Sequence, residues 1–121
     1  MPASSYKDLI VWQKSVTLAV MVYDLVERFP KEEIYGLVSQ MRRSAVSIPS
    51  NIAEGRYRGT RNDYAHFLRI SFGSGAELET QIEIAKRLPK TKHLRYEKID
   101  ALLEEVMKML NAMTRKFGPK N

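Results

Sequence analysis

Apolar residues recur at steps of three and four along the long segments of this 121-residue chain, and this spacing limits its possible folds most strongly. A repeat of 3.6 places side chains on one face of an α-helix, whereas a strand repeats every second residue. The pattern predicts helices over about residues 8–28, 33–57, 62–87 and 95–117. Because short links favour antiparallel neighbours, the sequence predicts an all-α fold, an antiparallel up-down four-helix bundle formed by residues 1–121 as a single domain.

Each predicted helix carries an apolar face that we expect to be buried. In chain order, the four faces are Leu9, Trp12, Val16, Ala19, Val20, Tyr23 and Val26; Ile34, Leu37, Met41, Ala45, Ile48 and Ile52; Tyr64, Phe67, Leu68, Ser71, Gly75, Leu78, Ile82 and Ala85; and Ile99, Leu103, Val106, Leu110, Met113 and Phe117. Burying them against one another contributes about 25 cal/mol per Å² of apolar surface. Pro30 and Pro89 end the first and third helices, and Thr60 or Asn62 can cap the third.

Pro49 lies inside the second predicted helix. A proline removes one backbone donor and crowds the carbonyl group four residues earlier, here that of Ala45, so a kink is expected. A complete break at Ser47-Ile48 is the competing interpretation. The apolar face keeps its phase from Ile48 to Ile52, which favours a kink.

A polar flank runs beside the apolar face of the second helix. It consists of Gln40, Ser44, Ser47, Asn51 and Glu54 together with Pro49, and the third helix offers Ser71, Ser74, Glu77 and Gln81 at similar spacing. If the two flanks face each other, their hydrogen bonds can be satisfied, whereas an unpaired buried polar group costs about 1–3 kcal/mol. We expect this polar flank to have a structural role, either inside the bundle or as a contact between subunits.

The net charge of +6 is concentrated in two segments. Residues 42–69 contain six Lys and Arg against two Asp and Glu, and residues 86–98 contain six against one. Clustered cations release counterions from a polyanion, and guanidinium groups beside tyrosines suit phosphate contact and base stacking. The candidate nucleic-acid-binding residues are Arg42, Arg43, Arg56, Tyr57, Arg58, Arg61, Lys86, Arg87, Lys90, Lys92 and Arg95. The alternative is that these charges only keep a small basic protein in solution.

The sequence predicts neither a catalytic site nor a site for a metal or cofactor. His66 and His93 are the only histidines, and neither completes the Glu-x-x-His step of a di-metal bundle. A serine nucleophile would lack a base and a Gly-x-Ser-x-Gly elbow. No Gly-Lys-Ser/Thr follows Gly73 and Gly75, so we expect these glycines to let two helices approach closely rather than to bind phosphate.

Two absences bear on the compartment. The chain contains no cysteine, which agrees with a reducing cytoplasm. No apolar run approaches the roughly eighteen residues that a membrane span needs. We therefore expect a cytoplasmic protein that does not interact with membranes.

The run Ser-Ile-Pro-Ser-Asn-Ile-Ala-Glu-Gly at residues 47–55 resembles the hallmark of the four-helix bundle proteins encoded in intervening sequences of bacterial 23S ribosomal RNA genes. The agreement extends to residues 8–13, 29–30, 33–37, 40–46 and 73–81. The resemblance implies an up-down bundle that assembles into a ring of five subunits. It also implies kinship with the accessory variability determinant of diversity-generating retroelements, a basic pentamer that looks like a nucleic-acid binder and a reverse-transcriptase partner.

The basic segments and the resemblance together predict a non-catalytic homo-oligomer, a pentamer by the resemblance, that binds RNA or DNA through phosphate contacts. The alternative function is a structural or adaptor bundle whose partner is a protein such as a reverse transcriptase. An adaptor would show no affinity for nucleic acid that depends on salt.

Overall fold

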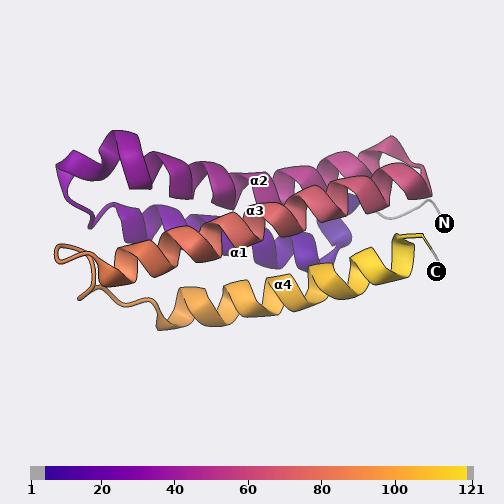
Figure 1. Cartoon of the computed structure of the whole chain (residues 1–121). Coiled ribbons are helices and arrows are strands. Elements are labelled where there is room, and N and C mark those ends of the chain that lie inside the picture. The colour runs from indigo at the N-terminus through magenta and orange to yellow at the C-terminus, as the bar shows by residue number, and fades with distance from the viewer. Residues whose placement is uncertain (1–4, 120–121) are drawn as a thin grey trace.

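The computed structural model describes residues 5–119, and residues 1–4 and 120–121, which the single-domain prediction includes, lie outside the described part. The elements are η1 (Tyr6–Asp8), α1 (Ile10–Val26), η2 (Lys31–Glu33), η3 (Ile34–Val38), α2 (Ser39–Arg58), α3 (Arg61–Arg87) and α4 (Glu97–Phe117). Residues 5–119 contain no strand, and the four long helices lie side by side in one bundle (Figure 1). The predicted all-α four-helix fold is confirmed.

The connections of the bundle gather at its two ends (Figure 1). At the end that we call the α3–α4 end, the α1–α2 and α3–α4 links meet, and Lys90 Nζ lies 2.9 Å from Glu32 Oε2. At the opposite, α2–α3 end, Arg61 at the start of α3 donates a hydrogen bond to the carbonyl of Lys116 near the end of α4. The two ends therefore carry different parts of the sequence, which decides where the basic residues lie.

The helix boundaries follow from local chemistry. Gly59 ends α2 in a left-handed conformation (φ 84°) that favours glycine. The next residue, Thr60, caps α3, because its side chain accepts a hydrogen bond of 3.1 Å from the backbone N–H of Asp63. The two-residue turn of Gly59 and Thr60 therefore places the end of α2 beside the start of α3.

Helix α2 continues across Pro49 from Ser39 to Arg58, so the break considered at Ser47-Ile48 is wrong. A kink at Pro49 stays a prediction. The irregular part of this segment lies earlier: η3 is a π-helical turn, and Gly36 inside it has a non-helical backbone (φ −107°, ψ −106°). The second predicted helix therefore has an irregular first part that the apolar spacing did not show.

The buried face of α1 differs from the predicted one. The residues of α1 in the core are Val11, Ser15, Leu18, Val22, Leu25 and Val26. The predicted face included Val20 and Tyr23, which are 57% and 41% exposed. The helix is apolar nearly all round, so two stripes fit the helical spacing, and the packing against α2 and α4 selects between them.

The predicted faces of α2, α3 and α4 mostly do form the core. Met41, Ile48 and Ile52 of α2 and Leu68 and Leu78 of α3 are among the largest fully buried side chains. The exception at the start of the second predicted helix is Ile34, which is 44% exposed. Each of these helices has a single apolar stripe, so the spacing left no choice of face.

Glycines permit two close helix contacts. A Cβ atom on Gly55 of α2 would lie 2.7 Å from the Cβ atom of Phe67 on α3, and one on Gly75 would overlap the Met107 side chain of α4. A Cβ atom on Gly73 would meet nothing within 4 Å. The predicted close approach therefore holds for Gly75 but is wrong for Gly73, and Gly55 permits a second close approach that was not predicted.

The contacts at these glycines predict opposite effects of alanine on stability. Gly55→Ala should lower the free energy of unfolding by about 1–3 kcal/mol, because Phe67 Cβ is close to its own backbone and cannot swing aside. Gly73→Ala should raise it by about 0.5–1 kcal/mol, because alanine is the better helix former and open space lies beside it. Urea unfolding followed by circular dichroism measures both. Equal effects of the two substitutions would contradict the contact at Gly55.

Candidate nucleic-acid interface

The centre of the polar flank is a hydrogen-bonded contact between α2 and α3. The hydroxyl oxygens of Ser47 and Ser74 lie 2.7 Å apart, and Asn51 Nδ2 donates bonds of 2.8 Å to the hydroxyl and the carbonyl of Ser47. Buried Ser71 donates a bond of 2.8 Å to the carbonyl of Ile48. These bonds hold α2 and α3 in one longitudinal register around Pro49.

The remaining residues of the polar flank divide between the interior and the surface. Ser44 and Pro49 are buried, whereas the side chains of Gln40, Glu54 and Glu77 are exposed. Gln81 is half-buried, and its Oε1 atom is buried without a hydrogen-bond partner among the described residues. The middle of the polar flank is therefore hydrogen-bonded between α2 and α3, and its exposed residues Gln40, Glu54 and Glu77 are open to solvent.

At the α2–α3 end, each of the three predicted arginines lies near a different aromatic ring. Arg58 Nε lies 2.8 Å from Glu54 Oε2, and its guanidinium lies 4.9 Å from the centre of the Phe67 ring. Arg61 donates a hydrogen bond of 2.7 Å to the Lys116 carbonyl.

The two other candidate residues at this end are Arg56, which lies near a buried ring, and Tyr57, which is exposed. The Arg56 guanidinium lies 5.9 Å from the centre of the buried Tyr64 ring, whereas Tyr57 is 84% exposed. An exposed ring is therefore present in the last turn of α2, the turn that also carries Arg56 and Arg58.

Arg42 and Arg43 lie away from this group, near the other end of α2. Thirteen residues separate Arg43 from Arg56, which corresponds to about 20 Å along a helix. The guanidinium of half-buried Arg42 lies 5.2 Å from the centre of the Tyr23 ring, and its Nε atom is buried without a hydrogen-bond partner in residues 5–119. Arg43 is exposed. The basic segment 42–69 therefore does not form one patch.

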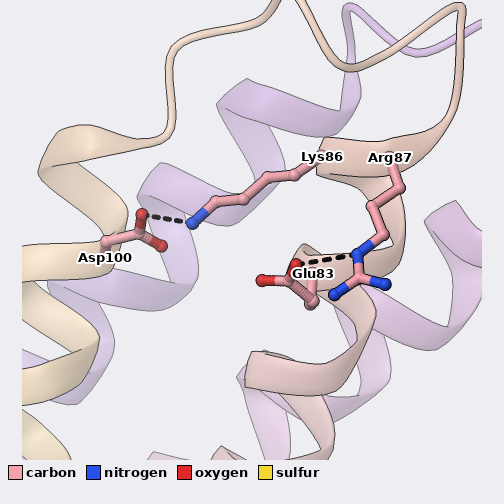
Figure 2. A network of polar contacts seen from close by, with 4 residues as sticks. All are labelled: Glu83, Lys86, Arg87 and Asp100. Carbon is pink, nitrogen blue, oxygen red and sulfur yellow. Dashed lines mark hydrogen bonds and ion pairs between the residues drawn. The ribbon is translucent and has the colours of Figure 1, made fainter.

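At the α3–α4 end, three of the predicted cations are already paired. Lys86 Nζ lies 2.6 Å from Asp100 Oδ2, and Arg87 Nε lies 3.0 Å from Glu83 Oε2 (Figure 2). Lys90 pairs with Glu32, as described above. The exposed residues Lys92 and Arg95 form no ion pair within the described part of the chain.

Two further cations at this end, Arg28 and Lys98, also lack an ion pair among residues 5–119. Lys98 lies in the basic segment 86–98, but Arg28 was missed, because it follows a helix whose charges nearly cancel. The one signal that could have found it is the bundle topology, which brings the end of α1 next to the start of α4.

Several pKa shifts follow from these contacts. Burial raises the pKa of the Tyr64 hydroxyl, and the charge of Arg56 opposes part of that rise. Burial also raises the pKa of Tyr96, whose hydroxyl donates a hydrogen bond to the Thr91 carbonyl. The hydrogen bond between Lys90 and Glu32 lowers the pKa of the carboxyl group and raises that of the ammonium group.

Residues 5–119 provide neither a metal site nor a membrane span. They contain no group of three or more His, Asp or Glu side chains able to hold a metal ion. In the same part of the chain, no helix combines the length and the apolar character needed to cross a membrane.

The sequence profile of a family described as 23S rRNA-intervening sequence protein matches residues 7–112. Among curated proteins, none matches the chain. The fold is similar to the crystal structure of a protein with unknown function from the S23 ribosomal protein family of Bacteroides thetaiotaomicron VPI-5482. That similarity has a TM-score of 0.76 at 26% sequence identity, and it covers 87% of this chain and 98% of the other.

The raised pKa of Tyr64 predicts a loss of stability in alkali. The folded state holds the phenol proton more tightly than the unfolded state, so this contribution is complete below the unfolded pKa of about 10 and is lost as pH rises through the folded pKa. The melting temperature should therefore fall between about pH 9 and 11, and fall less in Tyr64→Phe. Tyr57→Phe changes an exposed ring and serves as the control. A fall of the same size in both variants would contradict the assignment to Tyr64.

Proposed function

The chain belongs to the 23S rRNA-intervening sequence protein family, and we propose that it is a non-catalytic, homo-oligomeric protein that binds RNA or DNA through phosphate contacts at its basic ends. We place this activity in the cytoplasm, in agreement with the absence of cysteine. The family description names no activity, so the proposal is carried by the charges of this chain.

The observation that carries the proposal is the group of unneutralised cations at the α3–α4 end. Arg28, Lys92, Arg95 and Lys98 have no carboxylate within ion-pair distance among residues 5–119, although the chain has fourteen Asp and Glu. Like charges that gather without internal partners repel one another, and a polyanion removes that repulsion while releasing its own counterions. The cations therefore favour a phosphate backbone as partner.

The α2–α3 end adds a means to contact bases. Tyr57 is exposed in the same helical turn as Arg58, whose ion pair with Glu54 is itself half-exposed and so contributes little. An exposed aromatic ring on a basic helical turn allows an unpaired base to stack while the cations of that end contact phosphates. This arrangement favours nucleic acid with single-stranded segments and gives little direct readout of sequence.

A second apolar stripe on α1 supports self-association. Val20 of α1 and Val46 of α2 are 57% and 42% exposed, and the Arg42–Tyr23 contact joins the same faces of these helices. Helices α1 and α2 run in opposite directions (Figure 1). Val46 lies one turn after Arg42 on α2, and Ala19 and Val20 lie one turn before Tyr23 on α1, so these residues are on the same side of the Arg42–Tyr23 contact. Apolar surface of this kind is buried when copies of a chain associate. The number of five copies comes from the family resemblance.

Binding across a salt series tests the nucleic-acid proposal. Purified protein is titrated into labelled structured RNA and matched duplex DNA between about 50 and 300 mM salt. Replacing Lys92, Arg95 and Lys98 together by alanine at the α3–α4 end, or Arg56, Arg58 and Arg61 together at the α2–α3 end, should weaken binding and reduce the salt slope by up to about three units. The control variant replaces Lys7, Lys31 and Lys108, three cations outside the candidate residues, and should change the slope less than either end variant. Circular dichroism confirms that all triple variants stay folded.

Two outcomes would contradict this proposal. Absence of binding to either nucleic acid at the lowest salt would reject it and favour an adaptor that binds a protein such as a reverse transcriptase. A loss of affinity in the control variant as large as in both end variants would show that only net charge matters, and neither end would then be an interface.

Self-association is tested separately by light scattering. The wild-type protein should have a mass several times the 14.0 kDa of one chain. Val20→Glu combined with Val46→Glu should reduce that mass to one chain, because charged groups would have to be desolvated in the contact. Ile84→Glu changes an apolar residue on α3 that is 46% exposed, and it should keep the wild-type mass. A wild-type monomer would refute the homo-oligomer.

A further inference from the structure

A cavity of about 670 Å³ opens between the end of α1 and the start of α4. Its lining from α1 is spaced at steps of three and four, so that one face of the helix forms the wall. The lining residues are Met21, Asp24, Leu25, Arg28, His93, Leu94, Arg95, Lys98 and Ile99. The volume lies within the range of about 300–1,000 Å³ that small-molecule sites occupy.

The charge of this cavity is positive and is not balanced by the protein. Arg28, Arg95 and Lys98 face one carboxylate, Asp24, and none of the four forms an ion pair within the described residues. Ion pairs elsewhere at this end engage Lys86, which contributes nothing to the lining. An anion with more than one oxygen atom could therefore contact several free cations at once.

The start of α4 strengthens the preference for an anion. Lys98 and Ile99 line the cavity and belong to the first turn of α4, which has no side-chain cap. The first backbone N–H groups of a helix lack partners within it and carry partial positive charge. An anion held by Arg95 and Lys98 would lie close to these groups.

The rest of the lining is not suited to a bare anion. Met21, Leu25, Leu94 and Ile99 provide apolar wall, and His93 provides an exposed ring. A flat, weakly polar group can lie against such walls, and bases stack on imidazole rings in other nucleic-acid sites. Asp24 offers an acceptor for an exocyclic amino group such as that of adenine or cytosine.

We propose that this cavity binds a single nucleotide, with its phosphate at Arg28, Arg95 and Lys98 and its base against Met21 and Leu94. The nucleotide can be free in solution or an unstacked residue of a nucleic-acid chain. The inference deepens the proposed function and rests on it, since Arg95 is one of the candidate residues. It assigns a solvent-open cavity to one nucleotide, where the proposed function needs only surface phosphate contacts.

Calorimetric titration of the full chain with adenosine 5′-monophosphate, at about 50 mM salt, tests the site. The nucleotide should bind with a dissociation constant below about 1 mM, and inorganic phosphate and adenosine should each bind at least about tenfold more weakly. Arg95→Ala combined with Lys98→Ala should weaken nucleotide binding about tenfold or more. Lys31→Ala combined with Lys108→Ala removes the same charge from exposed positions outside the lining, and should change affinity by less than about twofold.

Amide chemical shifts of the unaltered protein give a second readout that needs no variant. Addition of the nucleotide should shift residues 21–28 and 93–99 and leave Gly59 at the far end unchanged. The site is refuted if no binding is detected, if phosphate alone binds as tightly as the nucleotide, or if the control variant loses as much affinity as the cavity variant. Binding of RNA with none of these nucleotide effects would refute the cavity and leave the proposed function intact.

A short single-stranded RNA, a hexanucleotide with a 5′ phosphate, distinguishes the two sources. If it displaces the mononucleotide and binds at least about tenfold more tightly, the site receives a residue of a nucleic-acid chain. If the mononucleotide remains bound in its presence, the site receives a free nucleotide. Both results support a nucleotide site, and they differ in whether the site belongs to the nucleic-acid interface.

Discussion

The close contact between α2 and α3 is the constraint on which the rest of the structure depends. Gly55 has no side chain, so α3 can approach until a Cβ atom on Gly55 would be only 2.7 Å from the Phe67 Cβ atom and 3.4 Å from the Tyr64 Cα atom. The Ser47–Ser74 hydrogen bond then fixes how far each helix extends past the other. Helix α3 runs for 27 residues, about 40 Å. Its length and this register together set the distance between the cations at the two ends of the bundle.

The helical class and most of the core could be predicted from the sequence, because α2, α3 and α4 each present one apolar stripe. Helix α1 could not, since Val20 and Tyr23 recur at helical spacing as well as Val22 and Leu25 do. Spacing identifies the stripes of a helix, but the neighbouring helices decide which stripe is buried. The irregular backbone at Gly36 was missed for a related reason: a glycine in an apolar run does not reveal the conformation that it takes.

In the candidate sites, too, contacts within one helix could be predicted from the sequence, whereas contacts between different elements could not. The pairing of Arg87 with Glu83 follows from a spacing of four residues, but Lys86 pairs with Asp100 of another helix, and Lys90 pairs with Glu32 across the two links. A count of charges therefore identifies basic segments without showing which cations are neutralised. These pairs are exposed enough to be weak, so a phosphate could compete for their cations at little cost.

If the chain assembles and binds nucleic acid as proposed, the positions of the apolar stripe and of the cations connect these two activities. The exposed stripe lies along the sides of the bundle at Val20 and Val46, whereas Arg28, Arg95 and Lys98, which line the cavity, lie at the α3–α4 end. In a closed ring of identical chains, contacts along the sides would bring equivalent ends of several copies to one face. The cations of neighbouring copies would then repel one another, and a bound polyanion would relieve that repulsion. Nucleic acid that binds the ring better than the single chain must, by linkage, stabilise the ring.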